Sequence, residues 1–223
     1  MQYRHEVKHE INYSDMLILK SRLCAVMKPD SHATGGKYKV RSFYFDTPSD
    51  KVLREKIDGV SRREKFRIRY YNGDTSTIFL EKKSKLGGLC AKESCRITED
   101  EAKRIISGDI FGMAKSEHGL LTELYSKMRA EGLRVKTVVD YTRQPFVYPA
   151  GNVRVTIDYD VRTGLPGTDL SDLAAVTLPA GESLIILEVK WDEFLPDIIR
   201  DAVNLDGRHE SAFSKYAQCR IYG

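Results

Sequence analysis

The sequence is poor in the residues and runs that mark several classes of protein. It contains four cysteines in 223 residues; none of them forms a Cys-x-x-Cys pair, and no histidine lies near them at metal-ligand spacing. The sequence therefore argues against a zinc site or a disulfide framework, and we expect reduced thiols in a cytoplasmic protein. No apolar run approaches the roughly 20 residues that a membrane-spanning helix needs, so we expect no membrane segment.

Signals for targeting and for internal duplication are missing as well. Residues 1–4 lead straight into a strand-like pattern, which predicts that no signal peptide precedes the domain. We find no internal repeat or low-complexity tract, and a chain of this length can bury a sizeable core, so we treat residues 1–223 as one domain. The formal net charge of +4 is modest. It does not by itself indicate a nucleic-acid partner, so any anionic partner must be inferred from where the cations lie.

The most informative stretch is residues 65–71, in which cations and apolar residues alternate. The two-residue period is that of a β-strand, so Lys65, Arg67 and Arg69 share one face and the side chains at 66, 68 and 70 share the other. Three like charges on one strand face repel one another unless an anion lies across them. A solvent-exposed face would screen them with water and salt, but the same layout recurs along the chain and favours an anion-binding surface.

The remaining pattern predicts a sheet with several packed helices. Strands are expected at 3–13, 40–46, 65–71, 78–85, 92–97, 136–145, 153–162 and 185–191, and helices at 14–27, 50–56, 98–107, 117–131 and 195–205. Ser14 or Asp15 is the expected cap of the first helix, and Thr98 with Glu101 forms a capping box. Asn72-Gly73 is a strong hairpin signal. Consecutive hairpins of this kind predict an antiparallel sheet and an α+β fold.

The polar row of these strands is dominated by cations. Its Lys and Arg residues are Lys8, Arg41, Lys65, Arg67, Arg69, Lys83, Lys85, Lys92, Arg96, Arg143, Arg154 and Lys190. An antiparallel sheet with this many strands tends to close into a barrel. If the apolar row faces outward under helices, the cations line the interior, where unpaired charge is costly without water and a polyanion. The interspersed Glu6, Glu81 and Glu188 suit Mg²⁺ or Mn²⁺, which prefer oxygen ligands.

Eight short pieces along the chain carry a family resemblance. They are Glu6-Val7-Lys8, Arg41-Ser42-Phe43-Tyr44-Phe45-Asp46, Arg67-Ile68-Arg69-Tyr70, Leu80-Glu81-Lys82-Lys83, Tyr141-Thr142-Arg143, Arg154-Val155-Thr156-Ile157-Asp158, Leu187-Glu188-Val189-Lys190 and Phe213-Ser214-Lys215-Tyr216. In this order they resemble the triphosphate tunnel metalloenzymes, and within them the catalytic domain of the vacuolar transporter chaperone (VTC) polyphosphate polymerases. The resemblance implies a closed tunnel of eight antiparallel strands with a basic lumen and outer helices.

The resemblance also implies an activity and a set of site residues. Polymerases of this family transfer the γ-phosphate of ATP to a growing polyphosphate chain with a divalent ion such as Mn²⁺ or Mg²⁺, so ATP and polyphosphate are the expected partners. The expected catalytic cations are Lys8, Arg67, Arg69, Lys83, Arg143, Arg154 and Lys215. Further substrate contacts are expected from Lys92, Tyr141, Ser214, Arg41, Lys85 and Lys190, and metal ligation from Glu188 and Glu6.

Several alternatives remain open from the sequence. Glu188 could pair with a lysine instead of a metal, Glu6 could simply orient Lys8, and Asp158 and Asp160 could be metal ligands or partners of arginines. Hydrolytic relatives carry Glu-x-Glu-x-Lys on the first strand, where this chain has Arg4 in place of the first Glu. We therefore favour a polymerase, with a triphosphatase or a non-catalytic polyphosphate-binding module as the alternatives. Whether a membrane protein receives the product is left open.

We do not expect nucleic acid as a partner. Base stacking requires aromatic side chains among the cations, and the alternation of residues 65–71 predicts that the aromatics face the other way.

Overall fold

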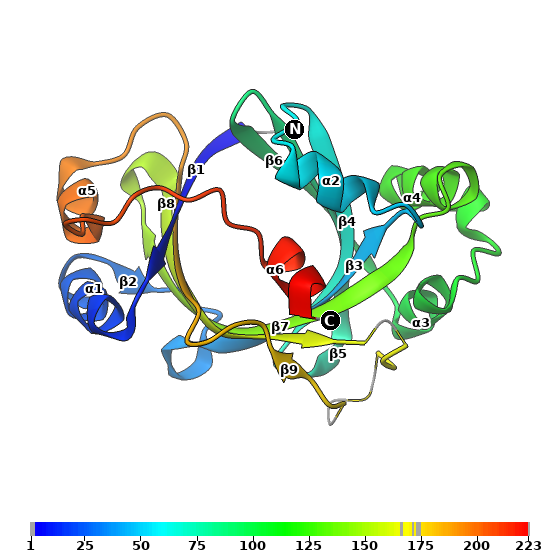
Figure 1. Cartoon of the computed structure of the whole chain (residues 1–223), viewed down its shortest axis with the longest axis horizontal. Coiled ribbons are helices and arrows are strands. Elements are labelled where there is room, and N and C mark those ends of the chain that lie inside the picture. The colour runs from blue at the N-terminus through cyan, green and yellow to red at the C-terminus, as the bar shows by residue number, and fades with distance from the viewer. Residues whose placement is uncertain (1–2, 166, 171, 173–174, 223) are drawn as a thin grey trace.

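The computed structural model describes residues 3–165, 167–170, 172 and 175–222, and its centre is a closed β-barrel (Figure 1). Eight antiparallel strands form it: β1 (Tyr3–Ile11), β3 (Tyr38–Asp46), β4 (Arg63–Tyr71), β5 (Asp74–Leu86), β6 (Leu89–Ile97), β7 (Arg134–Tyr148), β8 (Val153–Gly164) and β10 (Ile185–Trp191). Their order is β7-β3-β4-β5-β6-β1-β10-β8, and pairing of β8 with β7 closes the ring. The two-residue strands β2 (Lys28–Pro29) and β9 (Leu178–Pro179) pair antiparallel with β7 and β8, respectively. The predicted closed barrel is confirmed.

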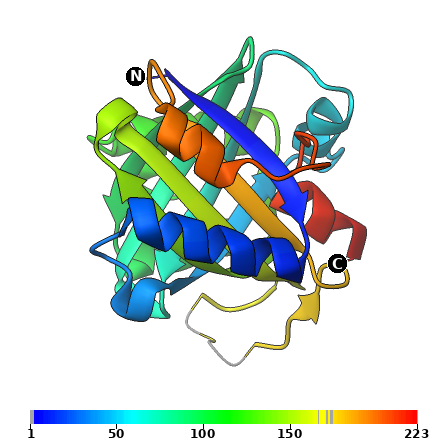
Figure 2. The ribbon, with the colours of Figure 1, turned by 90° about the vertical axis from the view of Figure 1, so that its left-hand side faces the viewer.

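Helices cover two opposite walls of the barrel. α1 (Tyr13–Val26) and α5 (Asp197–Val203) lie on one side, and α3 (Glu99–Ser107) and α4 (Gly119–Ala130) lie on the other (Figures 1 and 2). Short 3₁₀ turns occur at Thr34–Gly36, Met113–Lys115 and Ala150–Asn152. Within the described ranges, no helix is both long and apolar enough to cross a bilayer.

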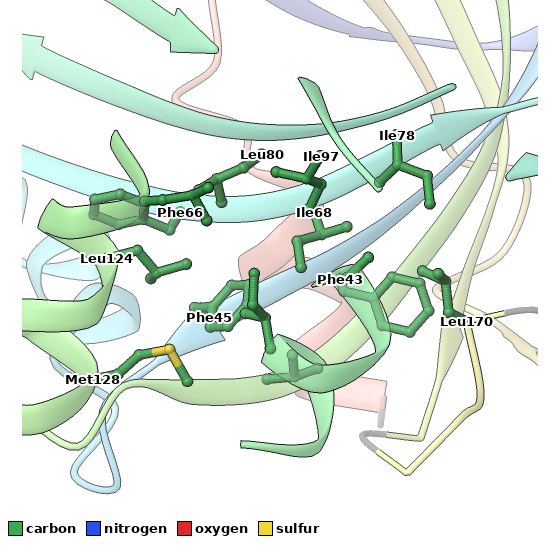
Figure 3. Close-up of a cluster of buried hydrophobic side chains, with 14 of the residues drawn as sticks. Phe43, Phe45, Phe66, Ile68, Ile78, Leu80, Ile97, Leu124, Met128 and Leu170 are labelled. Atoms are coloured by element: carbon green, nitrogen blue, oxygen red, sulfur yellow. The ribbon is translucent and has the colours of Figure 1, made fainter. Parts of the chain in front are cut away.

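The outward row of β3, β4 and β5 forms the larger hydrophobic core. Phe43, Phe66 and Ile68 are at most 2% exposed and pack with Leu124 and Met128 of α4 (Figure 3). Burying each such side chain stabilises the fold by roughly 1.5–3 kcal/mol. Because strand side chains alternate, burial of this row forces the residues between them to face the barrel interior. The helices outside therefore determine which side chains line the lumen.

Local sequence determines where the helices begin. Thr98 caps α3, and the side chain of Glu101 accepts a hydrogen bond from the backbone N–H of Thr98, as predicted. In α1 the cap is Asn12, whose side chain accepts from the N–H of Asp15 while Asp15 accepts from the N–H of Asn12. The expectation that Ser14 or Asp15 caps this helix is therefore wrong. The cap is Asn12, and Asp15 is the third residue of the helix and completes the capping box.

One end of the barrel, which we call the α6 end, is covered by α2 (Lys51–Ile57) and α6 (Lys215–Tyr222) (Figures 1 and 2). Both helices are held by Asp46, the last residue of β3. Its carboxylate accepts from the N–H groups of Thr47, Val52 and Leu53, and from the hydroxyl of Tyr216 at 2.5 Å. The helix predicted after Leu195, α5, lies on the outside of the barrel against α1.

Candidate functional site

The barrel encloses a cavity of about 400 Å³ with a cationic lining. Eleven Lys and Arg side chains line it: Arg4, Lys8, Lys65, Arg67, Arg69, Lys83, Lys92, Arg143, Arg154, Lys190 and Lys215. They come from seven of the barrel strands and from the first residue of α6. The row predicted at Lys65, Arg67 and Arg69 faces this cavity, because the residues between them are buried in the outer core.

The first carboxylate within the barrel wall is Glu81, which is 2% exposed. Its Oε2 lies 2.5 Å from Arg67 Nη2 and 3.7 Å from Arg69 Nη1, and its Oε1 lies 3.1 Å from Lys92 Nζ. Burial would raise the pKa of Glu81, but Arg67 and Arg69 outweigh it and hold the pKa well below its usual range. One carboxylate thus serves three cations and leaves net positive charge.

The second and third carboxylates, Glu6 and Glu188, lie on the neighbouring strands β1 and β10. Lys8 Nζ is 2.8 Å from Glu6 and 3.5 Å from Glu188, and Lys190 Nζ is 3.1 Å and 3.3 Å from them. Both carboxyls are buried, which by itself raises their pKa, yet the surrounding lysines lower the pKa of each below its ordinary value. Both groups are therefore ionised at neutral pH.

The fourth lumen carboxylate is Asp158, which is fully buried. Arg143 forms two hydrogen bonds of 2.7 Å to it, and Lys215 Nζ lies 2.5 Å away. Arg143 also reaches Glu188 at 3.2 Å. Asp158 thereby holds Lys215, at the start of α6, inside the lumen.

Lys65 differs from the other cations. Among the residues that the structure describes, no carboxylate lies within ion-pair distance of its Nζ, which sits 5.3 Å from the ring centroid of Tyr44. Burial lowers the pKa of Lys65 to about 8. Glu6 raises the pKa of Lys83, but Lys190 and burial outweigh it and bring the value to about 7. The two lysines lack sufficient negative charge around them, and a bound anion would supply it.

Tyr44 responds to the same excess of positive charge. Arg67 donates to its hydroxyl at 2.7 Å. Burial raises the pKa of Tyr44, but Arg67 and Lys65 act in the opposite direction and bring it to about 6. The cavity therefore favours negative charge even on a phenol.

A second cavity of about 350 Å³ adjoins the first at the α6 end. The two share Glu6, Lys8, Lys65, Lys83, Cys90 and Ser214 in their linings. The outer part of the second cavity adds the cations Lys56, Arg63 and Lys85. Together the two cavities form a basic path along the barrel.

The structure brings most of the predicted site residues together. Lys8, Arg67, Arg69, Lys83, Arg143, Arg154, Lys215, Lys92, Tyr141, Ser214, Lys190, Glu188 and Glu6 all line the first cavity, and Lys85 lines the second. Arg41 does not line the first cavity; its side chain forms a two-pronged pair with Asp140 and donates to the carbonyl of Asp172. Arg41 shares its strand row with Phe43 and Phe45, whose burial in the outer core turns the row outward. Arg41 thus lies outside the first cavity, although the resemblance implied a place for it among the substrate contacts.

Asp160 also lies outside the cavity, although alternation places it in the row of Asp158. Its φ of 51° is left-handed, and the register between β7 and β8 shifts nearby. Val161 consequently packs with the inner cluster around Tyr141, and the Asp160 side chain is 60% exposed. A bulge of this kind cannot be read from the two-residue period.

Three aromatic residues of the lumen were not predicted from the sequence. Tyr38, Tyr44 and Tyr71 line the first cavity beside Tyr141, which was expected to contact substrate. The expectation that aromatics face away from the cations holds for Phe66 and Tyr70 but is wrong for Tyr38, Tyr44 and Tyr71. The position of Tyr71 could have been predicted from the sequence. It follows Arg69 by two residues and therefore shares the strand face of Lys65, Arg67 and Arg69.

Two carboxylates of the site, Glu6 and Glu188, could contribute to binding a divalent ion, but they do not form a complete ligand set. Glu6 and Glu188 lie on neighbouring strands, and Glu6 Oε2 is buried with the ammonium groups of Lys190 and Lys83 at 3.1 Å and 3.6 Å. No cluster of three or more His, Cys, Asp or Glu side chains suited to a metal occurs within the described residues. Mg²⁺ commonly takes one or two carboxylates and completes its shell with substrate phosphates and water. The residues present fit that mode of binding.

The closed barrel and its cation-lined lumen define the class: this is a triphosphate tunnel protein. The chain belongs to the VTC domain family, whose model matches residues 3–222. A search of curated protein sequences finds no match.

Solved structures share the fold at low sequence identity. The PH1012 protein of Pyrococcus horikoshii is 14% identical with a TM-score of 0.52, and the alignment covers 95% of this chain and 96% of that one. A Bacillus halodurans protein, described only provisionally as an adenylate cyclase, is 14% identical with a TM-score of 0.51, over 85% and 80% of the two chains. These likenesses concern the fold alone.

Proposed function

We propose that this protein is a polyphosphate polymerase that transfers the γ-phosphate of ATP to a polyphosphate chain. Proteins with this tunnel fold are in general enzymes that act on triphosphates. The observation that supports a polymerase is the basic path formed by the two adjoining cavities. A hydrolase needs room for one triphosphate, whereas a polymerase also needs a channel for the growing chain.

The chain's own residues supply binding and charge compensation, which are the main requirements of phosphoryl transfer. Arg67, Arg69 and Arg143 present guanidinium groups to the cavity, and Lys8 and Lys83 act as point charges beside them. The terminal oxygen of the acceptor phosphate attacks the γ-phosphorus, the bond to ADP breaks, and ADP leaves as an anion. No general base is required, because the attacking oxygen is already ionised near neutral pH.

A divalent ion has a defined place in this proposal. Glu188 and Glu6 would hold Mn²⁺ or Mg²⁺, and the bound ion would neutralise charge on the β- and γ-phosphates. Glu188 contacts Lys8, Lys190 and Arg143. It therefore also orients the cations that hold the substrate.

A product analysis tests the proposed function. The protein is incubated with ATP and Mn²⁺, and the products are resolved by electrophoresis and chromatography. Long phosphate chains together with ADP support a polymerase, orthophosphate alone supports a triphosphatase, and unchanged ATP with tight polyphosphate binding supports a binding module.

Two buried arginines provide a matched pair of variants. Arg67 and Arg41 are each paired with one carboxylate, but only Arg67 lines the cavity. Arg67→Gln should lower the rate of chain synthesis by roughly 100-fold, comparable to losing one donor that stabilises transition-state charge. Arg41→Gln should retain synthesis. Equal losses in both variants would mean that the effect comes from barrel stability and not from phosphate contact.

A further inference from the structure

The cation row of β4 continues into an aromatic residue. Lys65, Arg67, Arg69 and Tyr71 occupy alternate positions, and all four line the first cavity. Alternate residues on a strand are about 7 Å apart, so the Tyr71 ring lies one such step beyond the guanidinium of Arg69. It stands at the end of the strand opposite the α6 end. The row therefore has a polar, phosphate-binding part inside and an aromatic part toward the opening.

Tyr71 is one side of a fixed aromatic corner. The ring of Tyr38, the first residue of β3, meets it edge to face, with centroids 5.3 Å apart at 89°. Tyr38 is only 7% exposed, and its hydroxyl accepts a hydrogen bond of 2.9 Å from Arg154. Arg154 is held in turn by Asp30 at 2.8 Å. The orientation of Tyr38 is thus set by polar contacts that do not involve Tyr71.

Tyr71 itself is less enclosed. It is only half-buried, while Tyr38 and Tyr141 beside it are nearly covered. Arg69 lies 5.9 Å from the Tyr71 ring centroid on the inner side. Because Tyr71 lines the cavity and is only half-buried, part of its side chain is available for contact with a ligand. An inorganic phosphate chain has no use for an aromatic face, whereas a flat heterocycle stacks on one.

We propose that Tyr71 and Tyr38 form a nucleobase-binding site at the opening opposite the α6 end. This inference rests on the proposed use of ATP and adds the part of the site that recognises the nucleoside. The nucleotide enters with its phosphates first, the base stacks on Tyr71 against the edge of Tyr38, and the triphosphate runs along Arg69 and Arg67 toward Lys65. The site favours a nucleoside triphosphate over inorganic triphosphate as the phosphoryl donor.

Binding measurements with two probes test the site. Dissociation constants for ATP and for inorganic triphosphate are measured by calorimetry for the wild type and for Tyr71→Leu, Tyr71→Phe and Tyr13→Ala. Tyr71→Leu removes the aromatic face but keeps the bulk, and it should weaken ATP binding roughly 10-fold or more. Inorganic triphosphate binding should change less than about twofold, because it makes no stacking contact. Tyr71→Phe keeps the ring and should retain most of the ATP affinity, and Tyr13, exposed on α1, serves as the surface control.

The possible outcomes separate this inference from the proposed function. If Tyr71→Leu weakens both ligands equally, Tyr71 acts by positioning Arg69 and the nucleobase site is refuted. If the wild type binds both ligands and Tyr71→Leu changes neither affinity, the nucleobase site is again refuted while triphosphate chemistry stands. If the wild type binds neither ATP nor inorganic triphosphate, the proposed function fails, and the inference fails with it.

Discussion

Arg67 on β4 and Glu81 on β5 face each other across the strand pair and form an ion pair of 2.5 Å inside the barrel. Both are almost fully buried, and Arg69 and Lys92 share the same carboxylate. Because three cations share one carboxylate, the side chains of the lumen carry an excess of positive charge. This excess of positive charge favours the binding of a polyanion.

The first prediction concerns removal of that carboxylate. Glu81→Gln should destabilise the ligand-free protein by about 3–5 kcal/mol, the range found when one partner of a buried ion pair is removed. Saturating inorganic triphosphate should recover much of this loss, since it supplies the missing negative charge. Thermal unfolding with and without triphosphate measures both effects. Equal destabilisation in the two conditions would show that the ligand does not bind near Arg67.

The second prediction concerns proton uptake on binding. The pKa of Lys65 is about 8, that of Lys83 about 7 and that of Tyr44 about 6. At pH 8 much of this set is therefore deprotonated in the free protein, and a bound polyanion raises all three pKa values. Binding of inorganic triphosphate at pH 8 should be accompanied by uptake of about one proton or more.

Calorimetry in buffers of different ionisation enthalpy measures this uptake. In Lys83→Arg the side chain stays charged, and in Tyr44→Phe it cannot ionise, so each variant should take up fewer protons than the wild type. Comparing variant with wild type cancels the ionisation of the ligand itself. Identical uptake in all three proteins would contradict the prediction.

The third prediction concerns stability against pH. Lys65 and Lys83 have pKa values below the usual lysine value in the folded protein, so the unfolded chain binds more protons than the folded chain between about pH 7 and 10. Their contribution to the free energy of unfolding should therefore rise with pH across this window. Denaturant unfolding of the wild type and of Lys65→Met, compared at pH 7 and pH 9, measures it. The variant should lose part of the pH dependence.

The fourth prediction concerns the anchor of α6. Tyr216→Phe removes the 2.5 Å hydrogen bond from the hydroxyl to buried Asp46. The loss should cost roughly 1.5–3 kcal/mol, as for hydrogen bonds to charged groups, and faster amide exchange should be confined to α6 and α2. Tyr13→Phe on the exposed start of α1 should change stability by less than about 0.5 kcal/mol. Uniform exchange across the barrel would argue against a local anchor.

The fifth prediction concerns the expected metal ligand. Glu188→Gln should lower turnover of ATP by roughly 100-fold or more, an effect in the range for a group that supports transition-state charge. Metal-free binding of inorganic triphosphate should persist, because the change removes a negative charge from the lumen. The matched control is Glu182→Gln at an exposed position. Wild-type turnover in Glu188→Gln would remove this residue from the mechanism.

The sequence by itself determined the strands, the hairpins and the two rows on each strand. In β4 the alternation from Lys65 to Tyr70 was sufficient, because a strand has only two faces and the apolar one must be buried. The family pieces then indicated a closed barrel of eight strands, which the structure confirms. Capping chemistry likewise predicted the start of α3 at Thr98.

Only the tertiary structure decided where individual rows point and what fills the barrel ends. Arg41 faces outward because it shares a row with Phe43 and Phe45 in the outer core, and Asp160 leaves the lumen through a bulge. Placement of Tyr216 against Asp46 joins residues 170 positions apart. Such features depend on packing between distant segments, and a local two-residue period carries no information about them.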